Sequence, residues 1–349
     1  LAQSQRTNIM KEKQMTVSSS RKKTPWDEKD DLTPTKSFIK SNYQSHYDEK
    51  HPRLGETNEA DLINSYPVTE CPCCTSCRFI RNGYDSNGIQ MYRCKDCGRK
   101  FTRLTGTIFQ DHKISVTEWI EYCLDLMGYS SLNATSMNNK NSSTTSKYWM
   151  EKIFLLLRSV SDSLALSGTV YIDEKMYRVV KHELIEVDGH KLRGISRNQY
   201  CIGIGYDGHI TFCQVEGTGK TSIPKTWAAF GSRIVPGSKL IHDKEKSHIA
   251  LTKRLNLTSI AYDSKSLRGL PDNENPLNPI NKQCFMLERF LDTHQGFNRD
   301  ELQDYCNLFM FIMNPPSNKL EKVKVLLDSA MTSAVTLKFR ACFKANSDD

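Results

Sequence analysis

The chain has 349 residues, of which 38% are hydrophobic and 25% are charged, and its formal net charge is +8. This length predicts two or three domains. The chain has no run of about 18 apolar residues, which argues against a transmembrane helix, and its first residues lack the pattern of a secretory signal. The basic balance is compatible with a nucleic-acid partner.

Residues 1–66 are polar and show no periodic apolar pattern. Such a composition cannot bury enough apolar surface to offset the entropy that ordering costs. We therefore expect a mostly disordered tail, with a short helix near residues 60–66.

Residues 67–104 contain six of the twelve cysteines. Two C-x-x-C pairs are separated by nineteen residues, a spacing typical of a structural zinc site with four thiolate ligands. A pairing that begins with Cys73 and Cys77 is a rival register, but the first pair mirrors the second and is favoured. We predict one zinc ion per chain, and binding it would fold this small segment. The predicted ligands are Cys71, Cys74, Cys94 and Cys97.

The same module is strongly basic, and basic zinc ribbons commonly contact phosphate. Two long helices follow within residues 105–166, with a shorter helix between them that Ser131 would cap; Ser142 or Ser143 would cap the last helix. Such a helix-turn-helix segment can place a helix in the major groove, although a hairpin that only packs is an equal alternative. The residues assigned to DNA are Arg93, Lys95, Arg99, Lys100, Arg103 and Lys147.

From residue 167 the pattern changes to that of a mixed α/β layer. A strand is expected over residues 169–180, and an Asp-Gly turn predicts a hairpin over 199–217. Two nucleotide-binding motifs can be dismissed. The glycines of "GIGYDG" precede a strand rather than a helix, and "GTGKTS" has Gln214 where a P-loop needs glycine. The remaining expected elements are strands over 238–243 and 257–263, and helices over 221–231, 244–256, 277–294, 298–314 and 318–343.

Two aspartates lie among apolar residues of probable central strands, Asp173 in "VYIDEKMY" and Asp243 at the end of "KLIHD". An ionised side chain there is costly unless it is paired or metal-bound. Asp243 alone could be an ordinary helix cap, but two such residues in one sheet could converge on a divalent cation. A third ligand would come from the helix that carries Asn281 and Glu288, which are seven residues apart and share a face.

Several stretches of the sequence resemble those of a known family. The stretches "YRCKDCGRKFT", "TGTIF" with its Trp-bearing helix, "YIDEKMY", "LIHDKEKSH" and the helix from "NPINKQCFMLERF" onward resemble the zinc-ribbon DDE transposases of bacterial insertion sequences. Within these, the resemblance is to the group related to the Merlin superfamily, with its ISXO-type catalytic domain. It covers about residues 70 to 314, most of the chain expected to fold.

The resemblance implies an RNase H-like catalytic domain in which Asp173 and Asp243 are the first two catalytic aspartates. The third position, Glu in many relatives, falls on Asn281, and the Lys that commonly follows is replaced by Glu288 and Arg289. Glu288 is therefore a second candidate for the third ligand. The expected cofactor is Mg²⁺, as a pair of ions that stabilise the attacking and leaving oxygens.

The expected protein is thus a transposase that binds terminal inverted repeats and target DNA, acts as a homo-oligomer on DNA, and resides in the bacterial cytoplasm at the nucleoid. Two alternatives stay open, a zinc-ribbon DNA-binding protein without activity and an RNase H-like nuclease with another role. The expected segments are a tail (1–66), a zinc ribbon (67–104), a helical DNA-binding segment (105–166), a catalytic domain (167–314) and a C-terminal helix (315–349).

Overall fold

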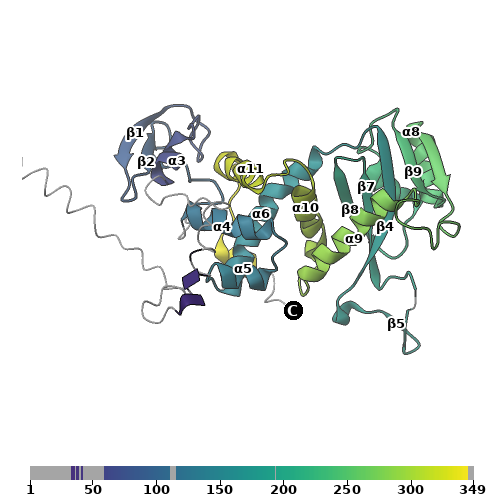
Figure 1. Cartoon of the computed structure of the whole chain (residues 1–349). Coiled ribbons are helices and arrows are strands. Elements are labelled where there is room, and N and C mark those ends of the chain that lie inside the picture. Colours follow the sequence, from purple (N-terminus) through teal and green to yellow (C-terminus); the bar gives the residue numbers. More distant parts are fainter. Residues whose placement is uncertain are drawn as a thin grey trace, which may run out of the picture. The chain divides into compact units, whose positions relative to one another are not determined.

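The computed structural model describes residues 33–35, 37, 38, 41, 59–110, 115–192 and 194–344. The chain divides into two units, residues 1–55 and 56–349, and the elements below belong to the second (Figure 1). Most of the tail predicted to be disordered therefore lies outside the described residues. Among the helices that are described, none combines the length and the apolar character that a membrane crossing requires.

The second unit begins with α3 (Glu59–Ser65), which corresponds to the short helix expected near residues 60–66. Its Ile63 is 1% exposed and belongs to the main hydrophobic core. The residues of this helix are thus a folded part of the protein, although the sequence placed them in the tail.

The cysteine-rich module is a small antiparallel sheet in the order β1-β2-β3. Its strands are β1 (Phe79–Tyr84), β2 (Gln90–Cys94) and β3 (Lys100–Phe101). Phe79, Tyr92 and Phe101 pack their rings together, with centroids 5.5 to 5.7 Å apart. Three aromatic side chains are a small core, so this sheet needs a further constraint to hold its shape.

Three helices follow, and they match the expected helical segment: α4 (Val116–Leu126), α5 (Leu132–Asn138) and α6 (Ser143–Asp162). The Ser131 hydroxyl accepts a hydrogen bond from the Ala134 amide at 3.1 Å, as an N-cap does. Ser142, one of the two candidates, plays the same role for α6 by accepting from the Thr145 amide. Trp119 and Trp149 are buried between these helices.

The larger sheet has five strands in the order β10-β9-β4-β7-β8. β4, β9 and β10 are parallel, whereas β7 is antiparallel to both β4 and β8. A three-stranded meander extended by two parallel strands is the RNase H-like arrangement, so the predicted fold class is confirmed. The strands are β4 (Thr169–Arg178), β7 (Gln199–Tyr206), β8 (Thr211–Thr218), β9 (Lys239–Asp243) and β10 (Thr258–Tyr262).

Helices cover both faces of this sheet (Figure 1). On one face, Tyr177 of β4 donates a hydrogen bond to the Leu291 carbonyl of α9, and Asn314 at the end of α10 bonds Thr211 of β8. On the other face, Phe230 of α7 packs on Phe212. The four helices are α7 (Ile223–Phe230), α8 (Lys246–Leu255), α9 (Asn278–Thr293) and α10 (Leu302–Met313).

Close packing of α7 on the sheet explains why glycine stands at the start of "GIGYDG", the first of the two dismissed nucleotide-binding motifs. A Cβ atom on Gly203 would lie 2.9 Å from the Phe230 ring, so glycine is needed there for helix–sheet contact. Between β4 and β7 the chain forms a small arm (Figure 1). It contains η2 (Lys181–Glu183), β5 (Glu186–Val187) and β6 (His190–Lys191).

The C-terminal region was predicted as one helix, and this is wrong. It forms two helices, α11 (Lys319–Thr332) and α12 (Phe339–Lys344). Earlier in the chain, the 3-10 helix η3 (Arg299–Glu301) precedes α10. Residues 333–338, "SAVTLK", separate the two helices because Val and Thr have low helix propensity. α11 contacts earlier parts of the unit: Tyr66 donates to Asp328 at 2.7 Å, and Arg103 donates to the Met331 carbonyl.

Candidate metal centre and active site

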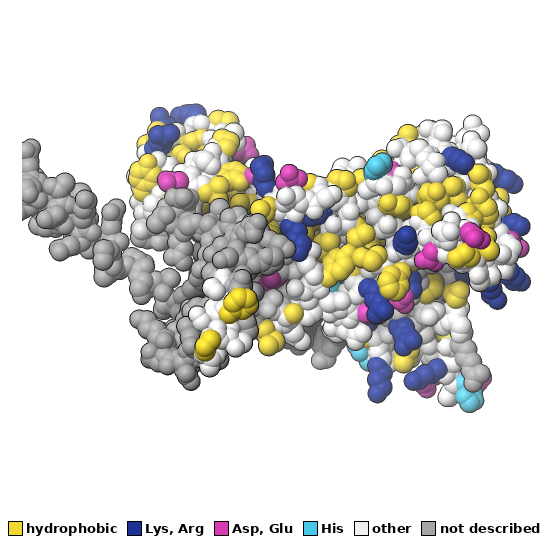
Figure 2. Space-filling view, viewed as in Figure 1, with side chains coloured by type: hydrophobic (Ala, Val, Ile, Leu, Met, Phe, Trp, Pro, Cys, Tyr) yellow, Lys and Arg dark blue, Asp and Glu magenta, His cyan; other side chains and the backbone are white. Residues whose placement is uncertain are grey.

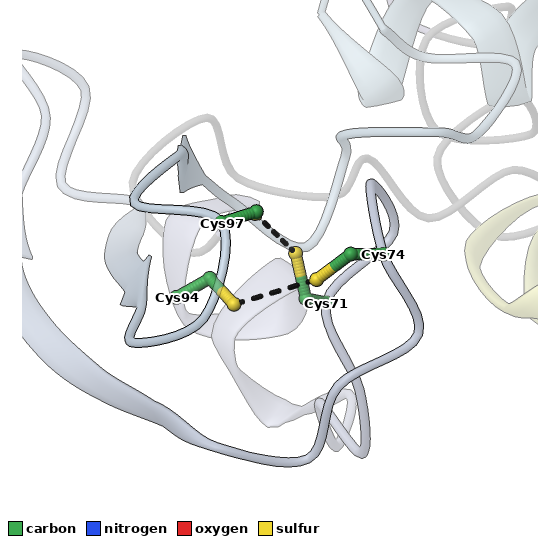
Figure 3. A group of neighbouring side chains, drawn as sticks. All are labelled: Cys71, Cys74, Cys94 and Cys97. Atoms are coloured by element: carbon green, nitrogen blue, oxygen red, sulfur yellow. Dashed lines mark hydrogen bonds between the residues drawn. The ribbon is translucent and has the colours of Figure 1, made fainter.

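The structure brings four cysteines of the ribbon together (Figure 3). The sulfur atoms of Cys71 and Cys97 are 3.7 Å apart, and those of Cys74 and Cys94 are 3.5 Å apart. Four sulfurs at about 2.3 Å from a central zinc ion would be separated by roughly 3.8 Å. The donor set and its spacing therefore fit a closed tetrahedral zinc site.

The favoured cysteine register agrees with this cluster, because Cys73 and Cys77 are exposed and lie outside it. The backbone amides of Cys97 and Asp96 lower the pKa of the Cys94 thiol to about 6. Amide donors that favour a thiolate are what a metal-binding turn requires.

The basic residues assigned to DNA divide into two groups. Arg93, Lys95, Arg99 and Lys100 are exposed on the ribbon, and Figure 2 shows basic side chains gathered there. Arg103 and Lys147 have other partners. Arg103 donates to the Met331 carbonyl, and burial lowers its pKa. Lys147 forms an ion pair with Glu301 at 3.2 Å. These two side chains thus connect parts of the protein in the structure, and their assignment to DNA stays a prediction.

Asp173 and Asp243 lie on adjacent parallel strands. The paired part of β4 and β9 ends where Tyr171 lies opposite Ile241, and each aspartate follows two residues later. Asp243 is not the cap of α8, because Glu245 occupies that position. The strand register thus places the two aspartates at the same level of neighbouring strands.

Each aspartate is held through one oxygen. Oδ1 of Asp173 accepts from the Glu174 amide at 2.8 Å. Oδ1 of Asp243 accepts from the Glu245 amide at 3.0 Å and contacts Nδ1 of His248 at 2.9 Å. Within the described part of the chain, neither Oδ2 atom has a hydrogen-bond partner. Two carboxylate oxygens therefore stay available to a ligand.

The electrostatics of Asp173 favour a cation. Burial raises the pKa of its carboxyl, and the negative charges of Glu174 and Asp243 add to this effect. Together they bring the pKa from 3.8 to about 6. A bound divalent cation would relieve this penalty by favouring the ionised form. Carboxylate oxygens are the ligands that Mg²⁺ and Mn²⁺ prefer, so this donor pair fits such an ion.

Helix α9 carries the candidates for a third ligand. Asn281 lies in its first turn and is exposed, and Cys284, three residues later, lies close to Asp173. Burial raises the pKa of the Cys284 thiol, and the charge of Asp173 adds to this effect. Glu288 is already paired, because its Oε2 lies 2.8 Å from Nζ of Lys175. Asn281 lies three residues before Cys284, on the same side of α9.

Two histidines near Asp243, His242 and His248, are buried. His242 lies within β9, and its Nε2 contacts the Ser259 hydroxyl of β10 at 3.0 Å. His248 lies in α8 and contacts both Asp243 and Glu174. Burial alone would lower the pKa of His248, but the two carboxylates outweigh it and raise the pKa to about 10.

Glu174 was missed altogether by sequence reasoning. Its Oε1 lies 2.8 Å from Nε2 of His248. Successive residues of a strand point to opposite faces, so Glu174 leaves β4 on the α8 side while Asp173 points toward α9. An acidic residue directly after a strand aspartate was the only available signal.

Comparison with known proteins gives one curated relative of interest. The chain is 24% identical over 292 residues, 75% of its own length and 91% of the relative, to an uncharacterised protein in transposable element ISH50 of Halobacterium salinarum. Searched against protein-family profiles, the chain has no match.

Two solved structures are also similar in part. The catalytic domain of the Mos1 mariner transposase matches 53% of this chain and 94% of its own, with 12% identity and a TM-score of 0.25. A pre-cleavage Mos1 transpososome matches 59% and 77%, with 10% identity and a TM-score of 0.20. The strand order described above is a property of this chain and stands independently of these matches.

Proposed function

We propose that this protein is a DNA transposase that binds the terminal inverted repeats of a mobile element, cleaves DNA there and joins it to a target. The observation that carries the proposal is the placement of Asp173 and Asp243 on adjacent parallel strands, where neither Oδ2 atom has a hydrogen-bond partner among the described residues. The ISH50 relative, which is 24% identical over 292 residues, supports a role in a mobile element.

In this proposal Asp173 and Asp243 hold the catalytic cations and Asn281 completes the site through its amide oxygen. Two Mg²⁺ ions would supply Lewis-acid stabilisation to the attacking and leaving oxygens of an in-line displacement. The protein residues themselves fix the position of the cations, and the sheet keeps the two carboxylates rigid relative to each other. The activated group would be water in cleavage and a 3′-hydroxyl in strand transfer.

The four cysteines would hold one structural zinc ion, which completes the ribbon around its three aromatic side chains. Arg93, Lys95, Arg99 and Lys100 would then contact DNA phosphates, and weaker binding at higher salt is expected from such contacts. Transposase action at two element ends would require at least two copies of the chain on one DNA complex.

The experiment is cleavage of the DNA that flanks the gene, with Mg²⁺ or Mn²⁺. Wild type is compared with Asp243→Ala and Asn281→Ala, and Asp263→Ala is the matched control because Asp263 follows the neighbouring strand β10 and is exposed. We expect wild type and the control to cut at the repeat ends and both site variants to fail.

A second function has one observation in its favour. The third position holds Asn281 rather than an acid, and Glu288 is occupied by Lys175, so the chain could bind DNA without cutting it. Wild type that binds the repeat ends but never cuts with either metal would support this inactive DNA-binding protein and refute the transposase. Loss of cutting in Asp243→Ala but not in Asn281→Ala would remove Asn281 from the site.

A further inference from the structure

His248 forms a bridge between two carboxylates from different strands. Its side chain is fully buried, and its two ring nitrogens contact Asp243 Oδ1 at 2.9 Å and Glu174 Oε1 at 2.8 Å. Three elements of the fold meet in this bridge: β4 supplies Glu174, the end of β9 supplies Asp243, and the first turn of α8 supplies His248.

The chemistry of the contacts fixes the direction of the hydrogen bonds. Ionised carboxylates only accept, so a ring nitrogen that contacts one is a donor. A nitrogen that donates has no lone pair for a metal ion. The proximity of His242, Asp243 and His248 could also suggest a separate metal cluster, but both nitrogens of His248 are already engaged.

The bridge determines which oxygen of Asp243 is free. Oδ1 is occupied from two directions, by His248 and by the Glu245 amide. Rotation of the carboxylate would break both bonds, so Oδ2 is held in one orientation.

Glu174 contributes to both aspartates. Its backbone amide bonds Asp173 Oδ1 on one face of the sheet, while its side chain supports His248 on the other. Glu174 therefore orients both carboxylates, Asp173 directly through its backbone amide and Asp243 through the imidazole of His248.

We propose that His248 and Glu174 are positioning residues that hold Asp243 with Oδ2 directed at the catalytic cation. This inference rests on the proposed function, because it needs a cation between Asp173 and Asp243. Removal of partners that orient a metal ligand commonly weakens metal affinity about 10- to 100-fold.

The test measures the affinity of the full-length, zinc-loaded protein for Mn²⁺ by electron paramagnetic resonance, without DNA. His248→Asn can keep a donor near the position of Nδ1, facing Asp243. His248→Gln can keep a donor near the position of Nε2, facing Glu174, and His248→Leu keeps neither. We expect His248→Leu to weaken Mn²⁺ binding about 10- to 100-fold, His248→Asn to recover most of that loss, and His248→Gln to recover little.

Thermal unfolding midpoints and zinc content are measured on the same samples, so that a general loss of structure is recognised. Mn²⁺ affinity equal to that of wild type in all three variants would overturn the inference. Losses of Mn²⁺ affinity in His248→Asn and His248→Gln that only follow the fall in the unfolding midpoint would also overturn it. Nitrogen coupling from a directly bound imidazole in the Mn²⁺ spectrum would also overturn it, because His248 would then be a ligand.

The proposed function has its own control in the same assay. Asp243→Ala should abolish tight Mn²⁺ binding if the aspartates form the site. If wild type and Asp243→Ala bind Mn²⁺ equally, the metal site of the proposed function is wrong and the inference falls with it. If Asp243→Ala loses binding while the His248 variants do not, only the inference fails.

Discussion

The replacement Asp173→Asn should make the metal-free protein more stable while it removes the metal site. Burial and the neighbouring acids raise the pKa of Asp173 from 3.8 to about 6. A tenfold change in proton affinity corresponds to about 1.4 kcal/mol. The ionised carboxylate thus costs the fold about 3 kcal/mol at pH 8. Asn carries no charge and can still accept the Glu174 amide through Oδ1.

The pH dependence follows from the direction of the shift. An acid whose pKa is raised in the folded state destabilises the fold fully above its folded pKa, and this cost vanishes below its unfolded pKa. The advantage of Asp173→Asn over wild type should therefore be greatest above about pH 6 and should fall toward zero as the pH approaches 4. At pH 5 it should be less than about 2 kcal/mol.

Thermal unfolding of both proteins without divalent cations, from pH 4.5 to 8, measures this difference. About 3 kcal/mol corresponds to a rise of roughly 5 to 10 °C in the midpoint at pH 8. Asp263→Asn, at the exposed end of β10, is the control and should change little at any pH. Added Mn²⁺ should stabilise wild type but not Asp173→Asn. An Asp173→Asn protein no more stable than wild type at pH 8, or equally favoured at every pH, would refute this reasoning.

Three further predictions follow from the ribbon, α9 and the core. Cys94→Ser should lose the single zinc ion measured by elemental analysis, whereas exposed Cys73→Ser should keep it; equal loss in both would reject the assigned register. Glu288→Gln should cut DNA within about threefold of wild type because Lys175 already occupies Glu288, and a loss of about 100-fold or more would make Glu288 a ligand. Phe290→Ala should lower the free energy of unfolding by about 3 to 5 kcal/mol. Exposed Phe285→Ala on the same helix should cost under about 0.5 kcal/mol, and similar costs would contradict the packing.

The sequence predicted most of the five-stranded sheet because its signals were local. The Asp-Gly turn at residues 207–208 fixed a hairpin, and apolar runs that end in polar caps fixed β9 and α8. Asp243 stood out because a charged residue ended an apolar strand. Each of these features is determined by neighbouring residues, so it could be predicted before any tertiary contact was known.

The features that the sequence did not predict depend on contacts between distant residues. Glu174 and His248 are 74 residues apart, and their meeting requires β4 and α8 to be placed on the sheet first. Arg103 and Lys147 were assigned to DNA from their charge, and the sequence did not predict their partners, which lie 228 and 154 residues further along. Asn281 was a candidate together with Glu288 from its place on the helix, the resemblance set it at the third position, and its role stays a prediction.

The contacts of α11 with the ribbon side of the protein bear on the order of synthesis. Asp328 and Met331 are synthesised after all strands of the five-stranded sheet. They nevertheless bind Tyr66 and Arg103, which precede that sheet in the chain. A nascent chain would therefore contain its cysteine cluster and both aspartates before α11, the helix that contacts Tyr66 and Arg103, has been synthesised. A chain that ended before residue 319 would lose these contacts together with the buried side chains of α11, which belong to the main hydrophobic core.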